Sequence, residues 1–447
     1  MKNSVIAIIL YATTAALIFV FSAGSAAAVV TFHPHLSTQT VYTDNVDLTP
    51  FDEEHDFITT ISPGMDLHMQ ERLSEATLSY TPSYSIYSRF SDYDSMRHDA
   101  SLTAMREIAR NTRLEFSNNY LYTEDPVQGP LYGLEDPAAD IDTTVRRGRE
   151  SYEKNRAELS LINQFGTEDT IEIGYEYFTM DNDDESVEDR DYHRPSMIIT
   201  YWPLPERLGT ETEISYTSCD FDDSGDFYAS DDYDEIYARF RLTRRFGPHL
   251  DIYAEYGHDV TDYDEEGEGA SEDYQVYTPA LGFVWESSPN SSVSGNFGYF
   301  FQDNDEGENE SGPKGTLEAS YSWSQYQTFS LIGTAGYDQT DEEAENLGFR
   351  EYYSLAGILD YRLSQSLVGN FSVGYYNNTY TSREPEREDD LWRASAGLAY
   401  QMLSWMVVEL DYTFRDLSSD FDLNEYTENR AMLKFTFAPR TPLLLKR

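Results

Sequence analysis

Cysteine, basic residues and long apolar runs are all scarce in this chain of 447 residues. Cys219 is the single cysteine, so no intramolecular disulfide can form, and stability must come from burial and backbone pairing. Only 31 Lys and Arg residues stand against 81 Asp and Glu residues, which gives a net charge of -50 at pH 7. Such a chain repels polyanions, so nucleic acid is excluded as an expected partner.

The one long apolar stretch lies at the amino terminus. Lys2 supplies a positive charge, residues 5–21 are mostly apolar, and residues 26–28 are all alanine. This order is typical of a secretory signal peptide, which we expect over residues 1–28, with an uncleaved membrane anchor as the alternative. No later stretch reaches the roughly 18 apolar residues that a spanning helix needs. Any membrane-spanning segments must therefore be strands.

Aromatic residues are abundant, with 36 Tyr, 24 Phe and 5 Trp. This content excludes an acidic disordered chain, which lacks such residues. Apolar and polar positions also alternate with a period of two: Ile236, Ala238, Phe240 and Leu242 alternate with tyrosine, arginine and arginine. Each such segment predicts a strand with one apolar and one polar face. The mean hydropathy of -0.58 is low because only every second residue is apolar.

We predict about 20 strands, with about 18 or 22 as alternatives. They begin near residues 32, 56, 73, 97, 112, 153, 169, 192, 208, 233, 250, 272, 291, 313, 328, 350, 366, 391, 405 and 428. The connections between them alternate between short turns and long, acidic segments, and four of the five Trp residues lie beside short turns: Trp202, Trp285, Trp323 and Trp405. This pattern predicts an all-β, single-chain antiparallel barrel in the outer membrane of a Gram-negative bacterium, with periplasmic turns, long acidic extracellular loops and an aromatic girdle. The barrel is expected over residues 29–439, followed by a short tail over 440–447.

One segment carries a resemblance to a known family. Residues 42–48 read Tyr-Thr-Asp-Asn-Val-Asp-Leu, and residues 56–64 read Asp-Phe-Ile-Thr-Thr-Ile-Ser-Pro-Gly. In these residues the chain resembles outer-membrane β-barrel porins associated with exosortase and exopolysaccharide gene clusters. The resemblance implies an envelope pore or a polysaccharide-export component. Barrels of this kind usually end on an aromatic residue, whereas here Phe437 is followed by ten more residues.

Charged residues on the polar face of the predicted strands are expected to line the pore. Charges that face inward indicate a water-filled interior, because isolated charges in a dry barrel are costly, and about 20 strands leave an aqueous channel. Cross-strand ion pairs that brace the wall are the alternative. The predicted pore-lining residues are Arg113, Glu115, Arg156, Glu158, Glu172, Glu176, Glu211, Glu213, Glu235, Arg239, Arg241, Asp251, Glu255, Glu318, Arg393, Glu409, Asp411, Arg415, Arg430 and Lys434. The longest loop, 124–150, is the first candidate to fold inward.

Two loops have the spacing of calcium ligands, with acidic or hydroxyl residues at alternate positions before a glycine. A diffuse divalent-binding surface is the alternative, because loops this acidic produce such matches readily. The expected Ca²⁺ ligands are Asp220, Asp222, Ser224, Asp226 and Asp231 in one loop, and Asp262, Asp264, Glu266 and Asp273 in the other.

Catalysis is not expected. His55 beside Asp56 and His258 beside Asp259 are the available acid–base pairs, and no nucleophile motif accompanies either of them. We expect no catalytic residue and no cofactor other than such cations.

The leading hypothesis is a porin-like channel for passive diffusion of small hydrophilic solutes, favouring cations because of its acidic outer face. The alternatives are an outer-membrane component of exopolysaccharide export and a closed barrel that serves as an adhesin or structural envelope protein. The expected partners are outer-membrane lipid, lipopolysaccharide, the barrel-assembly machinery and polysaccharide-export proteins.

Overall fold

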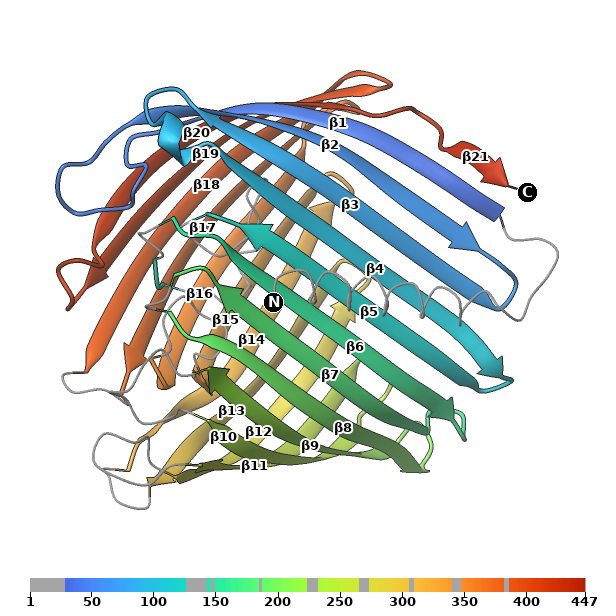
Figure 1. The fold of residues 1–447 in the computed structure, drawn as a ribbon. Coiled ribbons are helices and arrows are strands. Elements are labelled where there is room, and N and C mark those ends of the chain that lie inside the picture. The colour runs from blue at the N-terminus through green and yellow to red at the C-terminus, as the bar shows by residue number, and fades with distance from the viewer. Residues whose placement is uncertain are drawn as a thin grey trace.

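The structure is a computed structural model, and it describes residues 29–125, 143–145, 149–184, 187–222, 232–264, 273–304, 309–339, 347–381 and 386–446. Twenty long antiparallel strands form a closed barrel (Figure 1). The predicted all-β transmembrane barrel is therefore confirmed. No helix in these residues is long and apolar enough to cross a bilayer.

The strands follow one another around the wall in chain order. They are β1 (Val29–Thr43), β2 (Asp56–Gln70), β3 (Ser74–Tyr87), β4 (Ser95–Ala109), β5 (Thr112–Thr123), β6 (Tyr152–Gln164), β7 (Thr170–Asn182), β8 (Asp189–Leu204), β9 (Leu208–Asp222), β10 (Tyr233–Arg245), β11 (Leu250–Tyr263), β12 (Tyr274–Ser288), β13 (Ser291–Asn304), β14 (Ser311–Ser324), β15 (Gln327–Gln339), β16 (Phe349–Arg362), β17 (Leu367–Tyr380), β18 (Arg387–Leu403), β19 (Met406–Ser419) and β20 (Tyr426–Phe437). A short 3-10 helix, η1 (Ser91–Tyr93), precedes β4, and a short strand, β21 (Leu443–Lys446), follows β20.

Each strand pairs with its chain neighbours, and β1 closes the barrel against β20, with Leu36 opposite Phe437. Because β1 pairs with β20, neither terminal strand is an open edge from Leu36 to Thr43, and the backbone groups there are hydrogen-bonded within the wall. The predicted strand starts agree with the observed ones to within four residues. The largest difference is at β18, which begins at Arg387 instead of near residue 391.

Short and long connections alternate as predicted. Turns such as 71–73 and 110–111 join the strands at one end, whereas loops such as 44–55 and 124–151 join them at the other. In outer-membrane barrels the short turns face the periplasm and the long loops face outward. The start of β1 and the end of β21 then lie on the periplasmic side.

The C-terminal tail is part of the sheet. β1 extends past the end of β20, and β21 pairs with this extension, with Leu443 opposite Phe32 and Leu444 opposite Thr31. Figure 1 shows β21 beside the start of β1. β20 pairs with β1 only from Leu36 onward, and β21 covers the edge of β1 before that point. This matters because an unpaired strand edge is a site of aggregation.

The large apolar side chains that are exposed lie on alternate strand positions. On β10 they are Ile236, Phe240 and Leu242, and on β19 they are Leu410 and Tyr412. This alternation gives the barrel a lipid-facing apolar surface. It also sets the opposite face of each strand toward the interior.

The Trp residues follow this division with one exception. Trp285, Trp323 and Trp405 are exposed near the short turns, as the girdle prediction requires. Trp202 lies on the other face: the Arg245 guanidinium stacks 4.3 Å above its ring, and Gly209 leaves room beside it, because a Cβ there would meet the indole. The girdle prediction is therefore wrong for Trp202, which the arginine holds on the inward side.

Candidate channel interior

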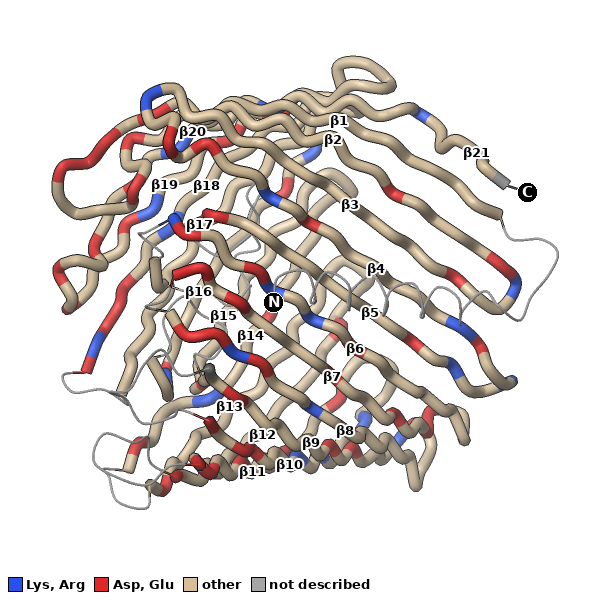
Figure 2. The backbone as a smooth tube through the Cα atoms, viewed as in Figure 1, with Lys and Arg blue, Asp and Glu red and all other residues tan. Residues whose placement is uncertain are grey.

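The strand register places all 20 residues predicted to line the pore on the face opposite the lipid-facing side chains. For example, Glu158 pairs with Glu176, and Arg239 pairs with Glu213 and is flanked by the outward Phe240. Charged residues recur along the strands around the barrel (Figure 2). That these residues line an open, water-filled pore stays a prediction.

The densest charge network lies on β9, β10 and β11. The Arg239 guanidinium donates hydrogen bonds to Glu211 at 2.8 Å, to Glu213 at 2.6 Å and to Glu255 at 3.1 Å. Arg241 also contacts Glu255, at 2.6 Å. All five side chains are partly buried, so each needs a partner of opposite charge. This network braces the wall across three strands and neutralises most of its own charge.

A smaller set of ion pairs lies on β19 and β20. Lys434 pairs with Glu409 at 3.1 Å, and Arg415 pairs with Glu428 at 3.3 Å. Arg393 on β18 stands opposite Arg415 in the register. Bases therefore gather in this part of the wall, whereas acids prevail on β9–β11.

Part of the longest loop, 124–151, lies inside the barrel. The loop joins β5 to β6, yet the Thr143 hydroxyl donates to Asp389 on β18 at 2.8 Å and hydrogen bonds with the Tyr380 hydroxyl on β17 at 2.9 Å. Val145 packs into a buried cluster with Leu391, whose neighbour along β18 is an exposed, outward tryptophan. Leu391 therefore faces inward, and residues 143–145 lie inside the wall, against the loop ends of β17, β18 and β20. This finding matches the expectation that this loop folds inward.

Arg149 anchors the return of the same loop. Its guanidinium donates to the Tyr87 hydroxyl at 3.0 Å and to the Val46 carbonyl, and it lies 4.5 Å from the centre of the Tyr93 ring. Its Nε is 3.6 Å from an Asp47 carboxylate oxygen. The loop is thus held at two places, near Thr143 and at Arg149.

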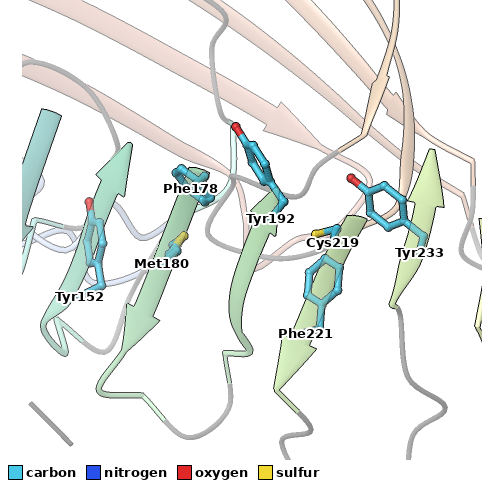
Figure 3. Close-up of a cluster of buried hydrophobic side chains, with 7 residues drawn as sticks. All are labelled: Tyr152, Phe178, Met180, Tyr192, Cys219, Phe221 and Tyr233. Atoms are coloured by element: carbon cyan, nitrogen blue, oxygen red, sulfur yellow. The ribbon is translucent and has the colours of Figure 1, made fainter. Parts of the chain in front are cut away.

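Aromatic side chains cover the interior near the long loops. Seven buried residues on five adjacent strands, β6–β10, form one cluster (Figure 3): Tyr152, Phe178, Met180, Tyr192, Cys219, Phe221 and Tyr233. Phe178 pairs with the inward Arg156 in the register, and the Arg156 guanidinium lies 5.4 Å above its ring. The cluster therefore lines the interior and stiffens the mouth of the barrel.

The end of the β15–β16 hairpin leaves the wall. Pairing between β14 and β15 stops at Gly315 with Ala335, although β15 and β16 remain paired as far as Gln339 with Phe349. Phe349 then packs against Tyr274 of β12, with ring centres 5.6 Å apart, and Gln339 hydrogen bonds with Tyr263 of β11 at 3.1 Å. The hairpin therefore leans over the inward face of β11 and β12.

Under this hairpin lies a cavity of about 460 Å³. We call it the β10–β15 pocket. Its lining includes Tyr233, Glu235, Tyr237, Asp259, Lys314 and Tyr337. In this partly open space, charged and aromatic side chains line one cavity.

The two predicted calcium loops lie largely beyond the described residues. Ser224, Asp226, Asp231 and Glu266 fall outside them. Asp220 and Asp222 end β9, and Asp262 lies in β11. Asp273 accepts a hydrogen bond from the backbone N–H of Tyr263, and Asp264 follows β11. The described part of the chain holds no group of three His, Cys, Asp or Glu residues that could bind a metal ion, and both sites stay predictions.

The two His–Asp neighbours differ in their surroundings. His258 and Asp259 are consecutive on β11, so their side chains point to opposite faces of the wall. His55 interacts with Arg89, and Asp56 accepts backbone hydrogen bonds from Phe57 and Arg89. Neither neighbour pair has the geometry of a base oriented by a carboxylate.

Several residues of the interior were not predicted from the sequence. No sequence pattern marks Thr143 or Arg149 as an interior residue, because their contacts join segments far apart in the chain. Lys314 was not selected either. Asp259 was named only as the neighbour of His258, although the alternation of β11 continues through it to Tyr263 and places it on the inward face.

A family model described as "Putative beta-barrel porin 2" matches residues 205–438, which is more than half of the chain. The match covers β9–β20 and not the segment 42–64 that carried the resemblance. Among curated proteins, none matches the chain significantly.

Solved structures with similar folds are outer-membrane proteins. The apoprotein form of the FrpB iron transporter from Neisseria meningitidis (F5-1 variant) aligns with a TM-score of 0.55 at 9% identity, covering 94% of this chain and 82% of that one. A mutant of the ferric enterobactin receptor PfeA from Pseudomonas aeruginosa gives 0.54 at 8% identity, covering 91% and 80%. The siderophore receptor PirA from the same species gives 0.52 at 10% identity, again covering 91% and 80%. At these identities the likeness shows the fold alone.

Proposed function

Because the chain belongs to the β-barrel porin family whose model it matches, an outer-membrane family of Gram-negative bacteria, we propose that it forms a channel for passive diffusion of small hydrophilic solutes. The observation that carries this proposal is the division of the strands into an apolar outward face and a polar inward face, charged on most strands, around a closed wall. A water-filled interior is the setting in which so many inward charges are stable. Family membership likewise favours transport over catalysis.

Export by the N-terminal signal peptide and assembly by the barrel-assembly machinery belong to the same proposal. So do contacts of the wall with outer-membrane lipid and lipopolysaccharide. Residues 1–28 have the order of a signal peptide, and the apolar outward face fits a lipid bilayer.

Cation preference is the second part of the proposal. Asp and Glu exceed Lys and Arg by 50 in the chain, since 81 minus 31 is 50. In the described ends of the strands at the long loops, acidic residues outnumber basic ones (Figure 2). An anionic entrance concentrates cations and repels anions, and this effect shrinks as salt rises.

The inward position of residues 143–145 favours small solutes over a polymer. An exopolysaccharide chain needs a wide, continuous bore, whereas Thr143 lies inside the wall, hydrogen-bonded to Asp389 and Tyr380. We therefore retain diffusion of small solutes as the leading function, with export of an exopolysaccharide and contacts with its export proteins as the rival.

Liposome swelling tests this proposal. The purified full-length chain is reconstituted into liposomes that are then placed in isotonic solutions of neutral solutes of increasing size. Swelling that is fast with glycerol, slower with a disaccharide and absent with a large dextran is expected. Liposomes that swell no faster than protein-free liposomes in any of these solutes would contradict a diffusion channel. Equal uptake of the dextran would instead favour the polymer-export function.

A further inference from the structure

The β10–β15 pocket contains two carboxyl groups that make no ion pair with a described cation, since Lys314 and Arg194 act on Asp259 only at longer range. Asp259 is only 7% exposed, and its Oδ1 has no hydrogen-bond partner in the described part of the chain. Glu235 shares a side-chain hydrogen bond with Asp259, and it accepts another from Thr217 at 3.0 Å. Two adjacent buried carboxylates repel each other unless a cation or a shared proton lies between them.

The other acids around this pocket already have basic partners. Glu213 contacts Arg239 at 2.6 Å, and Glu176 contacts Arg156 at 3.4 Å. Asp338 contacts Arg350 at 3.3 Å. Glu235 and Asp259 are therefore the acids of the pocket that no ion pair with a described residue holds.

Lys314 shows what kind of group suits the remaining walls. Its ammonium lies 4.6 Å from the centre of the Tyr337 ring, a distance at which a cation is attracted to an aromatic face. It makes no ion pair with a described carboxylate, so it does not neutralise Asp259 by direct contact. Tyr233 and Tyr237 also line the pocket.

From these contacts we infer that the β10–β15 pocket is a binding subsite for a small organic ammonium, held by Glu235 and Asp259 and flanked by tyrosine rings. The volume of about 460 Å³ is in the range of small-molecule sites and far exceeds that of a bare metal ion. The described acids also do not form a metal-binding group of three. A carboxylate pair beside aromatic faces is the combination that recognises organic ammonium groups.

This inference deepens the proposed function, because it names a class of solute that the channel would hold on its way through. A weak subsite of this kind concentrates one class of solute without stopping its passage. Lys314 is part of the same balance: its charge opposes that of an incoming ammonium, which keeps the subsite weak.

Calorimetric titration of the folded full-length chain in detergent tests the inference. The probes are propylammonium and choline, with glycerol as a neutral control and CaCl₂ as an inorganic cation. Saturable binding of both ammonium probes is expected, with no binding of glycerol. Binding at least tenfold weaker is expected in Asp259→Asn and in Glu235→Gln. The matched control Glu318→Gln removes an inward carboxylate outside the pocket and should leave the affinity unchanged.

Lys314→Met should tighten propylammonium binding, because it removes the ammonium group that already lies in the pocket. This variant keeps the test valid if removal of a carboxylate impairs folding. The inference is overturned if the ammonium probes do not bind, if only CaCl₂ binds, or if Lys314→Met and the carboxylate variants all bind like the unaltered protein.

Bilayer conductance of the same preparation separates the two proposals. A conducting protein that binds no ammonium removes the subsite and leaves the channel. A protein that binds ammonium but never conducts removes the channel and supports the subsite.

Discussion

Replacement of Arg149 by alanine should release the inward part of loop 124–151. The Arg149 side chain joins the loop to Tyr87 on β3, to the β1–β2 loop at Val46 and Asp47, and to Tyr93 in η1. A backbone hydrogen bond in the described residues of the loop, from the Asp183 N–H to the Ser151 carbonyl, lies at its β6 end and does not replace these contacts. The matched control is Arg72→Ala, which removes the same charge from an exposed position in the short turn 71–73.

The size of the effect follows from the contacts that are lost. A hydrogen bond to a charged group contributes about 1.5–3 kcal/mol, and a cation–π contact contributes roughly 0.5–1 kcal/mol. Allowing for water that replaces part of them, the loss in Arg149→Ala is on the order of 3 kcal/mol. Since about 1.4 kcal/mol is tenfold, the population of released loop should rise by roughly 100-fold.

Single-channel recording in planar bilayers measures this change. The variant should show a larger mean conductance and stronger current noise than the unaltered protein, whereas Arg72→Ala should behave like the unaltered protein. A folded Arg149→Ala barrel with unchanged conductance and noise would refute the inference that the inward part of this loop narrows the channel.

Four further predictions concern the wall, the second anchor, the pH response and the ions that pass. Arg239→Met should lower the free energy of unfolding by about 3–5 kcal/mol in urea titrations, because it leaves three partly buried glutamates without their shared partner; a loss below that of Glu318→Gln would contradict the bracing role. Thr143→Val should raise the conductance less than Arg149→Ala does, since it removes only the hydroxyl contacts to Asp389, Tyr380 and Asn378. Equal current traces for Thr143→Val and the unaltered protein would argue against that anchor. Burial, and next Asp125, raise the pKa of Glu124 above its ordinary value. A carboxyl group with a raised folded-state pKa stabilises the folded loop fully below the ordinary pKa, and this contribution is lost as pH rises through the raised pKa. Conductance should therefore increase with pH over that window, and this increase should be absent in Glu124→Gln. The reversal potential under a KCl gradient should indicate cation preference that weakens at high salt, and anion preference would exclude the proposed anionic entrance.

The strands could be predicted because their signal is local. Alternation along β10 and β19 identifies both the strand and its outward face. The same alternation places Arg239 and Glu213 on the inward face, where the structure pairs them. The same alternation along β11 places Asp259 on the inward face, although it was not among the predicted pore-lining residues. The period of two needs no tertiary information, since one face contacts lipid and the other contacts water.

The contacts of the inward loop and of the pocket could not be predicted, because they join distant segments, although the length of loop 124–150 favoured an inward fold. Thr143 reaches a residue 246 positions further along the chain. Lys314 meets Tyr337 where the β15–β16 hairpin leaves β14, and no residue pattern marks that departure. Trp202 faces inward because it alternates along β8 with the exposed Tyr201, and its position beside a turn does not show this.

Conductance of the purified full-length chain in a planar bilayer is the most direct test of an open interior. The account predicts discrete steps of current in KCl from each inserted barrel, with steps larger in Arg149→Ala. Insertion of correctly folded, heat-modifiable protein that never gives a current step would contradict it.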